Sequence, residues 1–276
     1  YLYISTGEGG IAALSQTTSN LNGKILRILP NESASAPYYA TTGNPFDTQA
    51  GAVTCGILPL MTTNGATGAC REVYALGLRN PFRFTIRPGT SEPWVGDVGG
   101  GVWEEIDVIT AGANYGHPVR EGPCSGGVLC NPANEGAHPA YTDPLYTYPH
   151  LSVYANFDSA VIGGAFYTGS SWPAEYQGDY FFAEFARGFI QRLKYNPATQ
   201  TWSAVDPEFA SDGQGLVGLK FGLDQNLYYL AYLSEQRTSE LRRIRYLSAG
   251  ENVPPFAQAS VSPTGGIPCR CFPGER

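Results

Sequence analysis

The chain has 276 residues, enough for one large all-β domain or a large part of one. It contains 34 Gly, 21 Pro and 18 Tyr, and only 15% of its residues are charged, which is typical of short strands separated by turns. The net charge of −7 argues against nucleic acids and anionic membranes as partners, because those partners select basic surfaces. No apolar run approaches the roughly 18 residues of a transmembrane helix, so we expect no membrane insertion.

Two strand patterns stand near the beginning of the chain. Residues 1–5 alternate like a strand, and residues 24–29 follow the Asn-Leu-Asn-Gly turn at 20–23. Because the chain opens inside a strand without an initiator Met or a signal peptide, we expect upstream residues in the native molecule. Residues 30–71 are rich in Pro, Gly and Thr and carry two cysteines, which indicates an extended, stapled loop.

From residue 72 onward, strand patterns recur at short spacing, interrupted by a second cysteine-bearing loop at 117–160. No helical period separates them, which predicts a sandwich, a barrel or a propeller. The best helix-like turn is residues 173–178. The expected strands are 72–78, 82–87, 93–97, 105–109, 161–167, 179–185, 189–195, 201–205, 216–222, 227–233 and 241–246.

The six cysteines lie in turn-like polar contexts, in near pairs. None of their spacings matches a zinc ribbon or a redox Cys-x-x-Cys motif. Loop cysteines in near pairs favour disulfides and therefore a secreted, extracellular or periplasmic protein. Cys269 and Cys271 are too close to each other for an easy mutual bond, and Asn31 begins a glycosylation sequon that agrees with secretion. The expected disulfides are Cys55–Cys70 and Cys124–Cys130.

Eight short motifs follow one another over residues 1–246: Leu2-Tyr-Ile-Ser-Thr-Gly7, Leu21-Asn-Gly-Lys-Ile-Leu-Arg-Ile28, Asn44-Pro-Phe46, Ala75-Leu-Gly-Leu-Arg-Asn-Pro81, Trp103-Glu-Glu-Ile106, Ala113-Asn-Tyr-Gly116, Gly163-Gly-Ala-Phe-Tyr167 and Tyr180-Phe-Phe-Ala183. Their sequences and their order resemble the glucose/sorbosone dehydrogenase family. This resemblance implies a six-bladed β-propeller. The expected strands make up about four blades, because a blade takes roughly 40–50 residues and the two long loops are left out of the count. Residues 1–248 would be a partial propeller, and the Pro/Gly/Cys-rich residues 249–276 a linker or tail.

The resemblance implies a binding site for pyrroloquinoline quinone, onto which family members oxidise a sugar. Arg79 and Asn80 match the pair that meets the carboxylates and carbonyls of the quinone, and guanidinium suits such an anion as a planar donor fork. Glu8 matches the acid that supports a catalytic histidine, which would precede Tyr1. The alternatives are a turn-capping role for Glu8 and a purely structural Arg-Asn turn.

Several departures from the family pattern weigh against an active enzyme. His117, His138 and His150 do not replace the upstream histidine, and we interpret them as surface or turn residues. The positions of three quinone-binding cations fall near Ala186, Gly215 and Val217. Because each charge-assisted hydrogen bond contributes roughly 1.5–3 kcal/mol, their loss predicts much weaker quinone binding.

The resemblance also implies calcium, which prefers carboxylate and carbonyl oxygens brought together by turns. Glu105 matches a side-chain ligand, and the backbone carbonyl of Tyr115 matches a second ligand. Asp97, Gly99 and Gly100 lie where relatives bind a cofactor-side calcium through backbone carbonyls. The alternative is a pair of surface acids, Glu104 and Glu105, at the start of a strand.

Two hypotheses for function follow. The first is a secreted sugar dehydrogenase-like propeller that would oxidise aldoses at C1 with pyrroloquinoline quinone, impaired in this chain. The second is a non-catalytic, calcium-stabilised extracellular binding or structural module. Under either hypothesis, the expected partners are a small sugar, an extracellular protein or glycan, or, in an assembly, an upstream segment or other chains. The sequence lacks the Gly-x-Ser-x-Gly, His-Glu-x-x-His and P-loop motifs of other enzyme classes.

Overall fold

The computed structural model describes residues 1–31, 39–56, 68–123, 141–151, 159–205, 208–211, 215–233, 237–247, 257–260 and 270–273. In these ranges the chain consists of short antiparallel strands and two short 3-10 helices, so the all-β prediction is confirmed. None of the helices in this part of the chain is long and apolar enough to cross a membrane. The chain divides into unit 1, residues 1–86 and 92–156, and unit 2, residues 87–91 and 157–276.

The first sheet of unit 1 is built around β2. This strand pairs with three others in antiparallel fashion, and five of its seven residues are at least half-buried. In the sequence, the 3-10 helix η1 comes between β1 and β2. The elements are β1 (Leu2–Thr6), η1 (Ala12–Gln16), β2 (Lys24–Pro30), β3 (Tyr39–Ala40) and β4 (Val73–Leu76).

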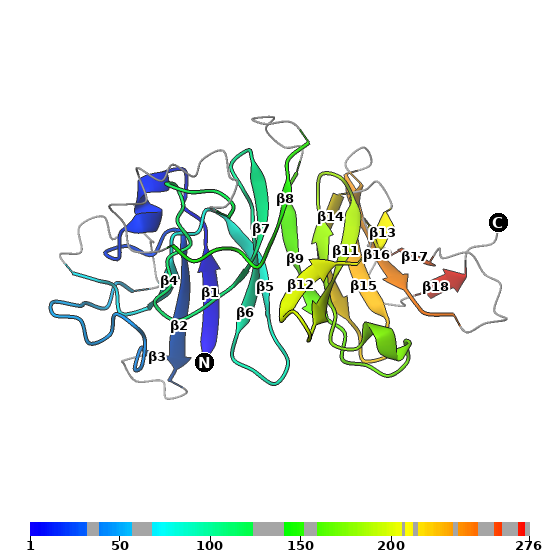
Figure 1. Ribbon diagram of the computed structural model, residues 1–276, viewed down its shortest axis with the longest axis horizontal. Helices are drawn as coiled ribbons and strands as arrows, with labels where there is room; N and C mark the ends of the chain where they lie inside the picture. Colours follow the sequence, from blue (N-terminus) through cyan, green and yellow to red (C-terminus); the bar gives the residue numbers. More distant parts are fainter. Residues whose placement is uncertain are drawn as a thin grey trace. The chain divides into compact units, whose positions relative to one another are not determined.

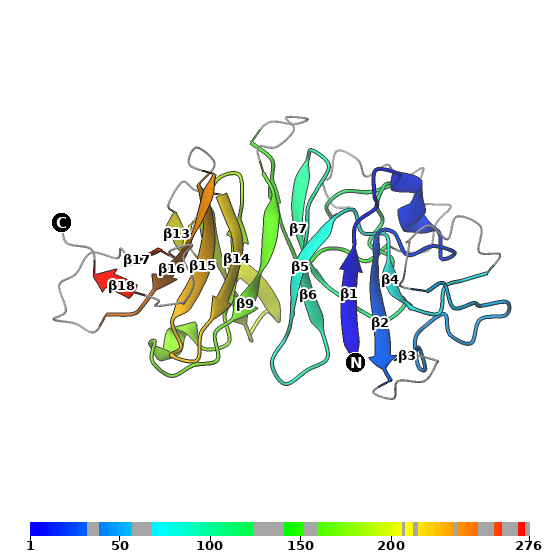
Figure 2. The same cartoon turned by 180° about the vertical axis from the view of Figure 1, so that it is seen from behind.

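The second sheet of unit 1 is a meander of four antiparallel strands in the order β5-β6-β7-β8. Figures 1 and 2 both show it beside β1 and β2. A shared apolar core, which includes Ile25, Tyr74, Val95 and Tyr115, joins the two sheets. The strands are β5 (Pro81–Ile86), β6 (Pro93–Asp97), β7 (Trp103–Val108) and β8 (Tyr146–Pro149).

Unit 2 contains a five-stranded and a three-stranded antiparallel sheet. Its core is aromatic: the Trp172 ring packs against those of Tyr167, Phe181, Phe209 and Phe221, with centroids 5.2–6.0 Å apart. The elements are β9 (Val161–Phe166), η2 (Ala174–Tyr176), β10 (Tyr180–Glu184), β11 (Phe189–Asn196), β12 (Thr201–Ala204), β13 (Ala210–Ser211), β14 (Gly215–Phe221), β15 (Leu227–Leu233) and β16 (Thr238–Ile244).

All the strands expected from the sequence are present, within a few residues at each end. The loop predicted at 117–160 contains the additional strand β8, which pairs with β7. In the predicted tail, β17 (Ala257–Ser260) and β18 (Arg270–Pro273) form an antiparallel pair. The number of propeller blades and the domain boundary at residue 248 stay predictions.

The Cys55–Cys70 disulfide is confirmed, with Cα atoms 5.3 Å apart. It closes the base of the first long loop, where Val53 and Cys70 also form an isolated bridge. Cys124, Cys130, His138 and Cys269 lie outside the described residues, so the second predicted disulfide stays a prediction.

Candidate functional site

The site is built around the turn between β4 and β5, which carries Arg79 and Asn80. Asp97 ends the neighbouring strand β6 and lies opposite Pro81 in the ladder. Its carboxylate accepts hydrogen bonds from the backbone N–H groups of Arg79, at 2.9 Å, and Asn80, at 2.6 Å. The side chain of Asp97 therefore fixes the backbone of the predicted quinone-binding pair.

The guanidinium of Arg79 is held by backbone carbonyls. Its Nη1 donates to the carbonyl oxygens of Val98, at 2.9 Å, and Gly99, at 2.6 Å. Binding of a cofactor-side calcium by the carbonyls of Gly99 and Gly100 stays a prediction. In this structure the Gly99 carbonyl accepts a hydrogen bond from Arg79.

Glu8 lies beside the same turn. Its backbone N–H donates to the carbonyl oxygen of Arg79 at 2.8 Å, and Gly7 packs so closely that an added Cβ would lie 3.3 Å from Asn80 Oδ1. The Oε2 atom of Glu8 is buried and has no hydrogen-bond partner among the residues that the structure describes. The fold thus gathers Glu8, Arg79 and Asn80, as expected for one site, while the histidine-supporting role of Glu8 stays a prediction.

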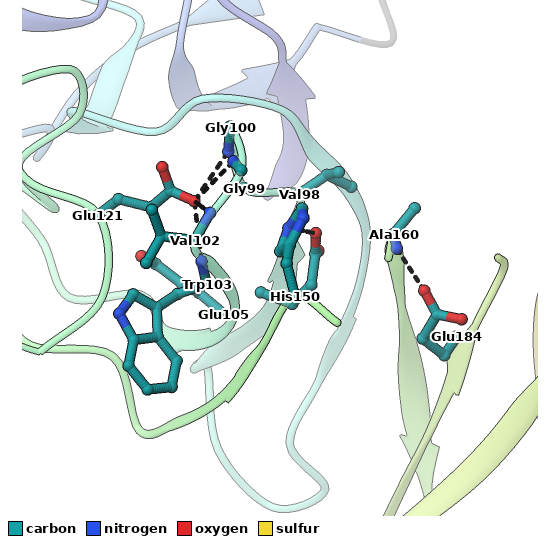
Figure 3. A network of polar contacts seen from close by, with 12 residues as sticks. Val98, Gly99, Gly100, Val102, Trp103, Glu105, Glu121, His150, Ala160 and Glu184 are labelled. Carbon is teal, nitrogen blue, oxygen red and sulfur yellow. Dashed lines mark hydrogen bonds and ion pairs between the residues drawn. The ribbon is translucent and has the colours of Figure 1, made fainter. Parts of the chain in front are cut away.

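Glu121 organises the glycine loop that follows Asp97. One oxygen, Oε1, accepts the backbone N–H groups of four successive residues at 2.9–3.1 Å, as Figure 3 shows. Gly99 is required here because a Cβ would lie 1.7 Å from the carbonyl oxygen of Trp103. Sequence reasoning missed Glu121, and the only local signal was the triple glycine whose N–H groups it binds. The four residues are Gly100, Gly101, Val102 and Trp103.

Three carboxylates lie together on one face of the β6–β7 ladder. Asp97 and Glu105 are directly opposite each other, and Asp107 follows Glu105 by two residues on the same face of β7. All three are buried, and one oxygen of each lies within 4.8 Å of an oxygen of the other two. Because Glu104 and Glu105 are both buried, their interpretation as surface acids is wrong.

Burial makes it costly to ionise this cluster. It raises the pKa of Asp97 to about 7, even though the N–H groups of Arg79 and Asn80 oppose the shift. Burial, then the neighbouring carboxylates, also raises the pKa of Glu105 well above its usual value, and the same two causes raise that of Asp107. Such a group of like charges requires either protons or a cation.

A small cavity of about 10 Å³ adjoins the cluster, close to the volume that holds one water molecule. Its lining includes Arg79, Asp97, Gly99, Glu105 and Tyr115, so the fold brings together five of the residues named from the sequence. Buried oxygens around a space of this size are a suitable donor set for Ca²⁺, which prefers carboxylates and carbonyls. The ligand roles of Glu105 and Tyr115 stay predictions.

The histidines lie in two different surroundings. His117 lines the cavity; burial, and then the charge of Arg79, lower its pKa to about 4, so it is neutral at pH 7. His150 is buried on the other face of β7, with Nε2 2.8 Å from Glu104 Oε1, so its interpretation as a surface residue is wrong. That neither histidine replaces the expected upstream residue stays a prediction.

The three positions at which cations were expected all belong to unit 2. Ala186 follows β10, and Gly215 and Val217 lie in β14. Near Ala186, the guanidinium of Arg187 lies over the Phe189 ring, 5.0 Å from its centroid, and the Arg187 backbone N–H donates to the Glu184 carboxylate. Arg187 is therefore already engaged within its own unit.

Comparison with known proteins decides the family. The sequence profile of the Glucose / Sorbosone dehydrogenase family matches residues 58–237. The chain belongs to the glucose/sorbosone dehydrogenase family. Among curated relatives, the HIPL2 protein of Arabidopsis thaliana is 32% identical over 202 residues, which are 67% of this chain and 26% of the relative.

Two solved structures share the fold of this family member. The apo-form of the soluble aldose sugar dehydrogenase from Escherichia coli is 24% identical, with a TM-score of 0.62 over 87% of this chain and 59% of that chain. The PQQ-bound aldose sugar dehydrogenase from Streptomyces coelicolor is 22% identical, with a TM-score of 0.55 over 90% of this chain and 55% of that chain. The chain described here thus spans little more than half of the length of each of these two dehydrogenases. The likeness confirms the predicted β-propeller-like fold class.

Proposed function

We propose that this chain forms the metal-bound, quinone-facing part of a secreted sugar dehydrogenase-like propeller, with weakened quinone binding. One observation carries the proposal: the Asp97 carboxylate is part of a buried acid cluster and also accepts the backbone N–H groups of the turn that presents Arg79 and Asn80. The position of a cofactor-binding pair would thereby depend on the same side chains that hold a metal ion.

Calcium is the ion that these residues suit best. Asp97, Glu105 and Asp107 offer only oxygen atoms, and no Cys or His belongs to the cluster among the described residues. Hard oxygen ligands in this number favour Ca²⁺ over zinc or copper. In the proposed role, calcium neutralises the buried charge and stabilises the β6–β7 ladder.

Arg79, Asn80 and Glu8 supply the chemistry of the proposed enzyme. Arg79 and Asn80 would bind and orient the anionic cofactor, and Glu8 would orient an upstream histidine toward the sugar. When bound, pyrroloquinoline quinone would accept the hydride from C1 of an aldose. The Streptomyces coelicolor structure, which is PQQ-bound, supports a quinone as the cofactor of this fold.

A second function, a non-catalytic and calcium-stabilised extracellular module, is favoured by the neutral residues at the three expected cation positions. Ala186, Gly215 and Val217 leave the quinone carboxylates without those partners, and the Arg79 guanidinium is partly engaged by two carbonyls. Such a module would bind an extracellular protein or glycan.

Titration separates the two functions. Protein freed of metal with EDTA is titrated with Ca²⁺ and then with pyrroloquinoline quinone, after which glucose and a dye acceptor are added. Quinone retention with turnover supports the dehydrogenase, whereas calcium uptake without quinone binding supports the module. A protein that takes up neither calcium nor quinone would contradict both proposals.

A further inference from the structure

One carboxylate of the acid cluster has no bonding partner of its own. Asp97 accepts two backbone N–H groups, and Glu105 accepts the N–H of Gly122. Asp107 is fully buried, yet neither of its oxygens accepts a hydrogen bond from any residue in the described part of the chain. Buried polar atoms are almost always paired, so this side chain requires a partner that the described residues do not supply.

The nearby cation does not fill this role. Arg120 acts on Asp107 through its charge, but its Nη2 donates to the Thr142 carbonyl at 2.6 Å, and its Nη1 lies 2.8 Å from Asp143 Oδ1. A bound proton would remove the charge of Asp107 and leave its second oxygen unbonded. A metal ion, in contrast, can bond to several of the carboxylates at once.

The geometry fits one shared ion. Calcium binds oxygen at about 2.3–2.6 Å, so two ligands on opposite sides of the same ion lie at most about 4.6–5.2 Å apart. The three carboxylates each place an oxygen within 4.8 Å of the others, which agrees with this limit. Because Glu105 and Asp107 stand two residues apart on one strand face, the pleat of β7 aims both toward Asp97.

We infer that Asp107 is a direct third carboxylate ligand of the calcium ion proposed above, and that Asp97 connects this ion to the Arg79–Asn80 turn. The inference rests on the proposed function and deepens it, because it assigns a ligand that the family resemblance did not indicate. Asp97 has two roles in this scheme: it is a carboxylate ligand of the ion, and it accepts the backbone N–H groups of Arg79 and Asn80.

The test compares three proteins after metal removal with EDTA: wild type, Asp107→Asn and the control Glu104→Gln. Glu104 is a buried acid of the same strand on the opposite face, and glutamine keeps an acceptor oxygen for His150. Calcium affinity is measured by isothermal titration calorimetry, and thermal unfolding is followed with and without Ca²⁺. We expect at least tenfold weaker calcium binding for Asp107→Asn and unchanged binding for Glu104→Gln.

A second readout separates ligation from a structural role. If Asp107 is a metal ligand, the metal-free Asp107→Asn protein unfolds at the same or a higher temperature than wild type, because repulsion from Glu105 is removed. A lower metal-free unfolding temperature, or wild-type calcium affinity in Asp107→Asn, would overturn the inference while leaving the calcium proposal intact. Absence of calcium uptake by the wild type would instead refute the proposed calcium site itself.

Discussion

Glu121 offers a sharp test of how the glycine loop is held. Its single Oε1 atom accepts four backbone N–H groups, and Glu121 itself is 9% exposed. Glutamine in its place keeps an acceptor oxygen but removes the negative charge. A hydrogen bond to a charged group contributes about 0.5–1 kcal/mol more than a neutral one, so four of them predict a loss of about 2–4 kcal/mol for Glu121→Gln.

Chemical denaturation of wild type and Glu121→Gln measures this difference, with Glu175→Gln as the control. Glu175 stands in η2, whose residues are not buried, and its replacement is expected to change the free energy of unfolding by less than about 0.5 kcal/mol. A loss below about 0.5 kcal/mol for Glu121→Gln would show that the carboxylate charge does not stabilise the loop.

Three further predictions concern other parts of the chain. Cys55→Ser with Cys70→Ser opens a loop whose ends are 15 residues apart and should lower the free energy of unfolding by about 3 kcal/mol, measured by denaturation under oxidising conditions. Gly99→Ala places a Cβ 1.7 Å from the Trp103 carbonyl oxygen. It should destabilise the protein by about 1–3 kcal/mol and weaken calcium binding. In the control Gly89→Ala, the added Cβ has no atom within 4 Å, so this variant tests the effect of positive φ alone. Burial raises the pKa of Asp179 from 3.8 to about 6. Between these pH values the folded state therefore binds more protons than the unfolded state. The stability that Asp179 contributes consequently falls as the pH rises through this window. Asp179→Asn should remove that slope between about pH 4 and pH 6, and an unchanged slope would mean that another group titrates there.

The strands were accessible from local pattern because short runs of apolar, aromatic and β-branched residues are bounded by turn residues. The strand expected at 93–97 and the one expected at 227–233 coincide with β6 and β15. In contrast, β8 has the short sequence Tyr-Thr-Tyr-Pro, and its strand conformation depends on pairing with β7 across a long connection. Local pattern carries no information on such a distant partner.

The site residues likewise divide into those that a local motif identifies and those whose role depends on the fold. Arg79, Asn80 and Glu105 were found through contiguous motifs, and Glu8 through its glycine turn, since a motif preserves the spacing that the chemistry needs. Asp97 was named only for its backbone carbonyl, yet its side chain holds the neighbouring turn.

The roles of Asp107, Glu121 and Glu104 depend on contacts between residues far apart in the chain. Glu121 reaches N–H groups 18–21 residues away, and His150 reaches Glu104 across 46 residues. Composition and periodicity were sufficient for an all-β chain with its turns, because those follow from local backbone preferences and the alternation of side chains. Which acids are buried, paired or left for a metal ion follows from strand register and packing, which bring distant residues into a common low-dielectric space.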